Sequence, residues 1–413
     1  MSKSFEHGLS QEELVEIGRN SMSLNFRQAP LVMVRGEGLY VWDAAGRRYI
    51  DFVGGIAVNG MGHAHPRVVD AVQRQVQQLW HVSNLYFNEP QILLSRALAD
   101  KYGDGRVFLA NSGAEANEAA IKLARRYAAK VKGEPQRNGF ITFEHSFHGR
   151  TLGALAATGQ PKYHDGFEPM IPGFRYAQFN DLASVDALLD DTICAVMVEP
   201  IQAEGGLILP EPGFLSGLKR LCEERGALLI LDEVQVGMGR TGSFFAYEQE
   251  GIKPDIVTLA KALGAGLPIG ALISSQEVAP GFQPGSHGST FSGNAVACRA
   301  GLAVLEIMED DALLDHVTTT GTYFASRLQK LSSHRIVEGA RGRGFILGLA
   351  LGPPWAREAA ARCMARGLLV NRLNDHTLRF LPPLVTQRAH IKAAVDILVD
   401  VLSDLERNPP EGT

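Results

Sequence analysis

Six short apolar runs between residues 105 and 275 constrain the fold of this chain more than any other feature of its sequence. They cover residues 107–110, 140–143, 195–198, 227–231, 256–259 and 271–273, and stretches with helical spacing separate several of them. A strand with one face in water alternates apolar and polar residues, whereas these runs do not alternate and so predict strands buried on both faces. Such strands, separated by helices, are typical of a mainly parallel sheet with helices on its faces. We therefore predict an α/β fold for this region.

The two ends of the chain predict a second, smaller unit. Residues 31–52 alternate around two turn signals, as in a small antiparallel meander. Residues 342–351, 368–371 and 377–381 are predicted to be further strands, and apolar residues from 391 to 405 follow helical spacing. Because 413 residues are too many for a single core, we predict a small α+β domain built from both termini. The predicted boundaries are 1–62 for an N-terminal arm and a portion of the small domain, 63–315 for the large domain and 316–413 for the rest of the small domain.

Charge and cysteine content exclude some classes of partner. The chain has 40 Lys plus Arg against 45 Asp plus Glu, a net charge of −5, which gives no reason to expect nucleic acid or an anionic membrane as a partner. Its four cysteines lie far apart without a CxxC motif, as expected for reduced thiols. The N-terminus has no apolar signal region, and no apolar run approaches the roughly 20 residues that span a bilayer. We expect a cytoplasmic protein.

Polar or small residues follow the apolar runs, at the positions where ligands bind in parallel sheets. Each of five runs is followed by one member of this set: Ser112-Gly113-Ala114, Phe147 with Arg150, Glu199, Asp232, and Lys261. An isolated lysine is normally a surface residue, and Ser112 alone is equally consistent with an ordinary helix N-cap. Together, however, they match the needs of pyridoxal 5′-phosphate: a helix N-terminus for the phosphate, a flat partner and a carboxylate for the ring, and an amine for the aldehyde.

Three other motifs are weaker. Residues 237–242 match GxGxxG, but no clear helix opens there, so a dinucleotide site is not favoured. The histidine pairs at 63/65 and 145/148 have no matching third ligand, so we predict no metal. The Asp232-Glu233 pair suggests a Walker B strand, yet the chain has no GxxxxGK[ST] loop for phosphoryl transfer.

Longer blocks carry a family resemblance. They are GGIAVNGMGHAHP, NSGAEANEAAIKLAR, FHGRTLGALAATGQPKY, CAVMVEPIQAEGG, LLILDEVQVGMGRTG, TLAKALGAGLPIGA, GSHGSTFSGN and LRFLPPLV. In this order they resemble the class III (ω-amino) aminotransferases of PLP fold type I, most closely the acetylornithine aminotransferases, from about residue 29 to about residue 402. The resemblance implies a large domain with a mainly parallel, seven-stranded-type sheet flanked by helices.

It also implies cofactor roles at the matching positions. Lys261 would bond to the cofactor's aldehyde and shuttle a proton, and Asp232 would pair with the ring nitrogen. Gln235 would bond the ring hydroxyl, Phe147 would stack on the ring, and Glu199 would support the cofactor side. The predicted phosphate site comprises Ser112, Gly113, Ala114 and, from a neighbouring subunit, Thr290. That last role requires a homodimer with shared active sites.

For substrates, the resemblance implies that Arg150 and Arg379 bind carboxylates, with Glu204 masking Arg379 when no matching carboxylate is present. Ser289 is also predicted at the substrate site. The implied reaction passes an amine from N-acetyl-L-ornithine through the cofactor to 2-oxoglutarate, giving N-acetyl-L-glutamate 5-semialdehyde and glutamate, a step of arginine biosynthesis. The alternatives are three: succinylornithine transaminase; a different class III aminotransferase that acts on another ω-amino acid or amine; and an isomerase or decarboxylase on the same scaffold.

Five positions bear on the choice among substrates. Ile56 and Phe87 stand where ornithine aminotransferases usually have tyrosine, which fits a donor whose α-amine is acylated. Ala203 stands where glycine is usual after EPIQ, and Phe291-Ser292 replaces the usual Tyr-Gly. We expect these departures to lie near the cofactor or the substrate entrance.

Overall fold

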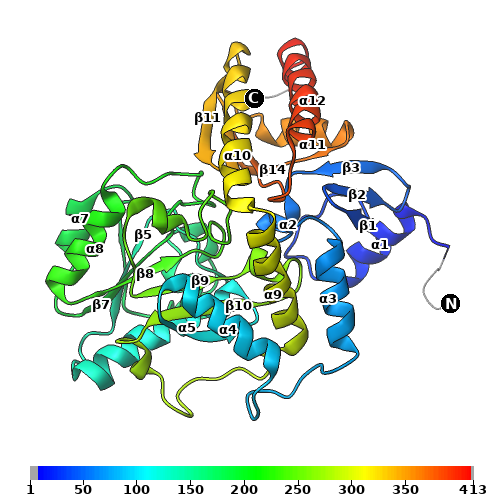
Figure 1. The fold of residues 1–413 in the computed structure, drawn as a ribbon. Helices are drawn as coiled ribbons and strands as arrows, with labels where there is room; N and C mark the ends of the chain where they lie inside the picture. Colours follow the sequence, from blue (N-terminus) through cyan, green and yellow to red (C-terminus); the bar gives the residue numbers. More distant parts are fainter. Residues whose placement is uncertain (1–7, 411–413) are drawn as a thin grey trace.

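The computed structural model describes residues 8–410, and its largest element is a seven-stranded sheet (Figure 1). The strand order is β4-β10-β9-β8-β7-β5-β6, and only β10 runs against its neighbours. The strands are β4 (Gly105–Ala110), β5 (Gly139–Phe143), β6 (Phe174–Ala177), β7 (Ile193–Val198), β8 (Leu228–Asp232), β9 (Ile256–Leu259) and β10 (Gly270–Ser275). The prediction of a mainly parallel sheet is confirmed.

Each of the six apolar runs forms a strand, and the burial of β8 shows why the runs do not alternate. Ile230 packs in the cluster formed with helix α5, whereas Leu229 and Leu231 pack in the larger cluster on the other face. The strand that the runs did not indicate is β6, an edge strand whose first three residues are only half-buried. An edge strand needs fewer apolar residues, so its sequence signal is weaker.

Helices cover both faces of this sheet. Helix α5 (Gly113–Tyr127) lies on one face, and α4 (Glu89–Tyr102), α8 (Phe214–Arg225) and α9 (Ala295–Asp310) contribute to the cluster on the other. Further helices of this region of the chain are α3 (Pro66–Val76), α6 (Leu152–Ala157) and α7 (Leu182–Leu188). Short turns of other helix types occupy Ala128–Lys132, Pro161–Tyr163, Ala246–Glu250, Lys261–Gly264, Ala279–Gly281 and Lys330–Ser333.

Segments from both ends of the chain share a small sheet, of order β1-β2-β3-β13. It joins β1 (Met33–Glu37), β2 (Tyr40–Asp43) and β3 (Arg48–Asp51) to β13 (Leu368–Leu369), which runs parallel to β3. The preceding helix α1 (Gln11–Ser21) buries none of its residues, and the turn α2 (Gly54–Ala57) follows β3. The predicted meander is therefore present, and it pairs with the C-terminal region as expected for an α+β unit.

A third sheet, of order β11-β12-β15-β14, completes the C-terminal region above the large sheet (Figure 1). It contains β11 (Val337–Arg343), β12 (Ile346–Leu351), β14 (Asn371–Asn374) and β15 (Thr377–Phe380). Helices α10 (Leu313–Gln329), α11 (Ala356–Ala365) and α12 (Arg388–Arg407) accompany it. The predicted domain boundary at residue 315 falls in the first turn of α10, and the division into domains stays a prediction.

Two predicted C-terminal strands are wrong in their limits. Residues 342–351 contain the turn of the β11–β12 hairpin, because Gly344 has a φ of +58° and ends the first strand. A side chain there would place its Cβ 2.5 Å from the carbonyl oxygen of Arg240. Residues 368–371 belong to two sheets, since the chain passes from β13 to β14 at Val370. Both changes depend on distant contacts that a local pattern does not contain.

Between residues 8 and 410, no helix is both long enough and apolar enough to cross a membrane.

Candidate functional site

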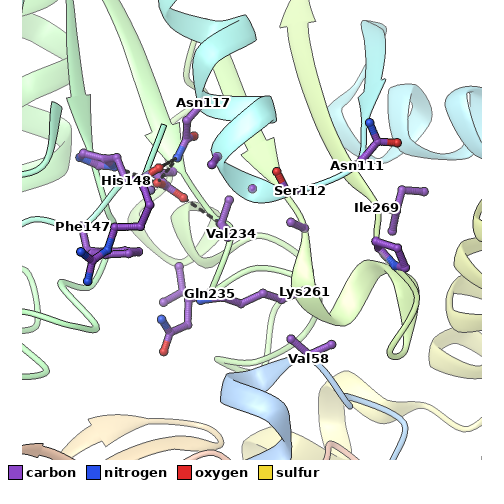
Figure 2. A pocket seen from close by; sticks show the side chains of 18 of the residues that line it. Val58, Asn111, Ser112, Asn117, Phe147, His148, Val234, Gln235, Lys261 and Ile269 are labelled. Carbon is purple, nitrogen blue, oxygen red and sulfur yellow. Dashed lines mark hydrogen bonds and ion pairs between the residues drawn. The ribbon is translucent and has the colours of Figure 1, made fainter. Parts of the chain in front are cut away.

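A cavity of about 440 Å³ lies at the carboxyl ends of the parallel strands (Figure 2). Nine of the thirteen predicted site residues line it: Ser112, Gly113, Ala114, Phe147, Arg150, Glu199, Asp232, Gln235 and Lys261. They follow five different strands, and the parallel topology brings those strand ends to one edge of the sheet. Glu204, Ser289, Thr290 and Arg379 do not line the cavity.

The start of helix α5 presents free backbone donors to this cavity. Ser112 is the N-cap, and its side chain accepts a hydrogen bond from the Glu115 amide at 3.1 Å. Among the described residues, the amides of Gly113 and Ala114 have no acceptor. Gly113 has no room for a side chain, because a Cβ would lie 2.6 Å from Val234 Cγ1. Unpaired amides at the positive end of a helix dipole form a site for an anion such as phosphate.

Asp232 is the most firmly held carboxylate of the cavity, and it is only 4% exposed. Its Oδ2 accepts a hydrogen bond from Asn117 Nδ2 and contacts His148 Nδ1, both at 2.8 Å, and its Oδ1 accepts from the Val234 amide at 3.0 Å. Figure 2 labels these three partners, Asn117, His148 and Val234. Asn117 is fixed in turn, because it accepts from Thr258 Oγ1 at 2.7 Å. Asp232 therefore has one defined orientation at the cavity wall.

The neighbouring Glu233 has a structural role instead. Its carboxylate accepts hydrogen bonds from the amides of Ala246 and Tyr247 at 2.8 and 2.9 Å. Burial raises the pKa of Glu233 to about 8. The acidic pair after β8 thus divides, with Asp232 lining the cavity and Glu233 holding a distant turn.

Lys261 begins a short turn directly after β9 and has a φ of +46°, an unfavourable value for a residue with a Cβ. Figure 2 shows its side chain extending toward Gln235. Burial lowers the pKa of Lys261 to about 8, against the opposing effect of Glu204; Arg379 lowers it further, while Asp232 and Glu199 raise it. A larger fraction of this amine is consequently neutral, and able to bond to a carbonyl carbon, than for an exposed lysine.

The other two carboxylates differ in their environment. Burial, together with the nearby charge of Asp232, raises the pKa of Glu199 well above its usual value, although the Phe147 amide donates to it at 3.0 Å. Burial also acts to raise the pKa of Glu204, but the charge and hydrogen bond of Arg379 outweigh it, and the net shift is downward. Glu199 is therefore inclined to be neutral and Glu204 to be charged.

Arg379 lies behind the cavity wall in a dense set of contacts and is 1% exposed. Its Nη1 donates to Glu204 Oε1 at 2.6 Å, to Gln235 Oε1 at 3.0 Å and to the Ala203 carbonyl at 3.1 Å. Its Nε and Nη2 donate to Asn371 Oδ1 at 3.1 and 2.7 Å. Glu204 and Arg379 are thus one hydrogen bond from the cavity, through Gln235.

The remaining predicted residues lie on a different loop. Ser289 contacts a residue of the cavity wall, since Asn111 Nδ2 donates to its Oγ at 3.0 Å. Thr290 is exposed and does not line the cavity of its own chain. Phe291 is 61% exposed, whereas Ala203 is buried against Glu199 and Arg379. Ala203 therefore lies beside the cavity, as expected.

Comparison with known proteins identifies the family. The aminotransferase class-III family matches residues 21–402. The acetylornithine aminotransferase of Caldanaerobacter subterraneus subsp. tengcongensis is 47% identical over 92% of this chain and 96% of its own. The chain belongs to the class-III aminotransferases. A Pseudomonas aeruginosa protein named succinylornithine transaminase/acetylornithine aminotransferase is 45% identical over 93% of this chain and 95% of its own.

A structural relative points to the cofactor. An ornithine aminotransferase structure from Toxoplasma gondii, with partial occupancy of PLP at its active site, has a TM-score of 0.92 and 32% identity over 96% of each chain. The family is PLP-dependent, and pyridoxal phosphate is the cofactor of this aminotransferase. The cavity fits this group, because it combines unpaired helix amides, a buried oriented carboxylate and an amine of lowered pKa.

Sequence reasoning missed two residues that orient Asp232. They are His148 and Asn117, neither of which is among the predicted site residues. A signal for Asn117 is present, since it is a polar residue on the buried face of α5 among Ala116, Ala119 and Ala120. A buried amide needs polar partners, and here they are Asp232 and Thr258.

Proposed function

We propose that this aminotransferase converts N-acetyl-L-ornithine and 2-oxoglutarate to N-acetyl-L-glutamate 5-semialdehyde and L-glutamate, a step of arginine biosynthesis. The observation that carries the proposal is the convergence of Lys261, Asp232 and the α5 N-terminus in one cavity. Relatives named acetylornithine aminotransferase, 42–48% identical over most of the chain, support the choice of substrate.

Within the cavity, the cofactor-binding residues would have separate tasks. Bound pyridoxal 5′-phosphate supplies an aldehyde that exchanges with an amino group and a ring that withdraws electrons. The Gly113 and Ala114 amides, with Ser112, would hold the phosphate, and Asp232 would keep a proton on the ring nitrogen. Lys261 Nζ would hold the aldehyde and, when free, would move a proton to and from the reacting carbon of the substrate.

Three further residues would define the faces and edge of the ring. Phe147 would stack on it, and Gln235 would donate to its hydroxyl oxygen. Glu199, whose pKa is raised by burial, holds the Phe147 amide and would support the cofactor from that side. Stacking on the ring requires the backbone of Phe147 to stay fixed, and the hydrogen bond to Glu199 would fix it.

The two arginines would bind the carboxylates of the substrates. Among the described residues, Arg150 has no hydrogen bond or ion pair, so its donors are free for a carboxylate. Arg379 is paired with Glu204, and a second carboxylate would have to displace Glu204 to reach it. An acylornithine would therefore use Arg150, whereas 2-oxoglutarate would use both arginines. Ser289 would contribute to the same site through Asn111.

We also propose a cytoplasmic homodimer with shared active sites. Thr290 is exposed and outside the cavity of its own chain, which fits a contribution to the phosphate site of a second copy. The four cysteines are buried and unpaired, which fits a reducing compartment. In the proposed division of the chain, residues 1–62 form the arm and begin the small domain, residues 63–315 form the large domain, and residues 316–413 complete the small domain.

A parallel substrate assay tests the reaction. N-acetylornithine, N-succinylornithine, ornithine and 4-aminobutyrate are each supplied with 2-oxoglutarate, and the glutamate formed is measured. We expect N-acetylornithine to be the fastest donor. The Pseudomonas aeruginosa relative keeps N-succinylornithine as the second candidate donor, since its name includes both substrates. Fast turnover of a free amine with slow turnover of both acylornithines would overturn the proposal.

A spectroscopic experiment tests the role of Lys261. The purified wild-type protein should be yellow from its bound cofactor, and Lys261→Ala should lose the visible band that arises from the bond to Nζ. Lys253→Ala is the matched control, because Lys253 donates to the Gly103 carbonyl and does not line the cavity. An unchanged visible spectrum in Lys261→Ala would contradict the assignment.

A further inference from the structure

Arg150 and Arg379 are held in opposite ways. Arg379 has hydrogen-bond acceptors for each of its nitrogen atoms and is buried. Arg150 has none among the described residues, and its only partners there are two aromatic rings. An exposed arginine without a fixed partner loses side-chain entropy when it binds a ligand. Something other than a hydrogen bond must orient Arg150 if it is to bind a carboxylate well.

The ring of Tyr163 provides that support. The guanidinium carbon of Arg150 lies 3.9 Å from the centroid of this ring, closer than its 5.6 Å from the ring of Phe147. Tyr163 and Phe147 meet edge to face, with centroids 5.9 Å apart and planes at 82°. Stacking on the face of a ring leaves the N–H donors at the guanidinium edge unoccupied. Tyr163 thus restrains Arg150 without competing for its hydrogen bonds.

The backbone that carries Tyr163 is anchored to the end of β5. The Tyr163 amide donates to the Gln160 carbonyl at 2.9 Å, and buried Gln160 donates through Nε2 to the carbonyls of His145 and Ser146 at 3.2 and 3.0 Å. Gly159 sits so close to this strand end that a Cβ would lie 2.0 Å from the Phe143 carbonyl oxygen. The Gly159 amide also donates to Ser146 Oγ at 3.0 Å. The backbone that carries the Tyr163 ring is therefore fixed to the segment that leads into Phe147 and Arg150.

We propose that Tyr163 is a positioning residue, whose ring face holds the Arg150 guanidinium in place to bind a carboxylate of either substrate. This inference rests on the proposed carboxylate-binding role of Arg150. It assigns a function to a residue outside the cavity lining, and it predicts that the ring, rather than the hydroxyl group, is required.

The test compares three variants of the cofactor-loaded enzyme. Tyr163→Leu removes the ring and should raise KM for N-acetylornithine and for 2-oxoglutarate roughly 3- to 10-fold with little change in kcat, as expected for a lost cation–π contact. Tyr163→Phe keeps the ring and should remain within about 2-fold of wild type. Tyr163→Met replaces the leucine variant if the latter does not fold, as judged by circular dichroism and bound cofactor.

A double-mutant cycle with Arg150→Gln distinguishes positioning from general packing. In the Arg150→Gln background, Tyr163→Leu should cause no further rise in KM. The half-reaction with n-butylamine, which has no carboxylate, should proceed at the same rate in Tyr163→Leu and wild type. A loss in Tyr163→Phe equal to that in Tyr163→Leu, an undiminished effect in the Arg150→Gln background, or an equal loss with n-butylamine would each overturn the inference.

The cycle also separates this inference from the function on which it rests. A raised KM in Arg150→Gln with an unchanged KM in Tyr163→Leu overturns the role of Tyr163 alone. An unchanged KM in Arg150→Gln overturns the carboxylate-binding role of Arg150, and the role of Tyr163 with it.

Discussion

Replacing Glu204 by glutamine should improve the binding of 2-oxoglutarate. In the wild type, Glu204 Oε1 accepts from Arg379 Nη1 at 2.6 Å, and a dicarboxylate must break this charged contact to reach the arginine. The substitution retains an oxygen acceptor for Arg379 but removes the negative charge. Glu204→Gln therefore weakens the competitor for Arg379 and leaves in place the arginine that is proposed to bind the substrate.

The size of the effect follows from the kind of hydrogen bond that is lost. A hydrogen bond that involves a charged group contributes about 1.5–3 kcal/mol. The Glu204–Arg379 bond is charged on both sides and belongs at the upper end of this range, whereas a bond from charged Arg379 to a neutral amide belongs at the lower end, so the substitution should release about 1–1.5 kcal/mol. At 1.4 kcal/mol for each factor of ten, KM for 2-oxoglutarate should fall roughly 5- to 10-fold. KM for N-acetylornithine should change less than about 2-fold, because in the proposed mode this donor leaves the pair intact.

Steady-state kinetics with each substrate varied in turn provide the measurement. Glu134→Gln is the matched control, since Glu134 forms a surface ion pair with Arg137 and lies outside the cavity; it should leave both KM values unchanged. A KM for 2-oxoglutarate that rises in Glu204→Gln, or a parallel change for both substrates, would refute the proposed competition for Arg379.

Three further perturbations test other regions of the structure. In the cofactor-free enzyme, the rate of cofactor attachment should rise with pH through about 8, because the neutral form of Lys261 reacts and its pKa is lowered to about 8. Glu204→Gln should move the midpoint of this pH profile lower, since Glu204 raises the pKa of Lys261. A midpoint near the pKa of an exposed lysine would contradict the argument that burial lowers the pKa. Asn117→Ala removes three hydrogen bonds from the Asp232 cluster and should lower the free energy of unfolding by about 3–5 kcal/mol, measured in urea at fixed protein and cofactor concentrations. The exposed control Asn408→Ala should lower it by less than about 0.5 kcal/mol. Similar losses in the two variants would show that the cluster contributes little to stability. Gly344→Ala forces a Cβ onto a backbone oxygen at positive φ and should cost about 2 kcal/mol or more, whereas Gly339→Ala, where no atom lies within 4 Å, should cost less than about 1 kcal/mol.

The sequence predicted the wall of the cavity well because parallel topology converts a local pattern into a spatial one. The runs that form the parallel strands all end at the same edge of the sheet, so Ser112 and Lys261 line one cavity although they are far apart in the sequence. The strands could be predicted from apolar runs because both of their faces are covered. In β8, for example, Ile230 packs in one hydrophobic cluster, and Leu229 and Leu231 pack in the other. The placement of Lys261 and Asp232 at the cavity follows from this topology and required no knowledge of side-chain contacts.

Contacts that join different segments were beyond the reach of local patterns. The partners of Asp232 lie 115 and 84 positions away in the sequence, and the turn at Gly344 is imposed by the segment that contains Arg240. The sheet change at Val370 likewise depends on β3, which is more than 300 residues earlier. In each case, the local sequence permits several conformations, and a distant backbone or side chain selects one.

The two arginines show how this distinction bears on function. Arg379 lies on a strand, opposite Gly348 on one side and Asn371 on the other, and the asparagine side chain supplies an acceptor for its Nε and Nη2. The sheet therefore holds Arg379 in one place, and in the proposed mode a substrate carboxylate competes with Glu204 for it. Arg150 lies on a loop without such neighbours, so its orientation depends on a ring carried by the next turn of the chain. In the proposed mode, Arg379 is selective because Glu204 must be displaced, and Arg150 is available because the Tyr163 ring need not be displaced. In that mode, one cavity accepts a monocarboxylate, which uses Arg150 alone, and a dicarboxylate, which also displaces Glu204 from Arg379.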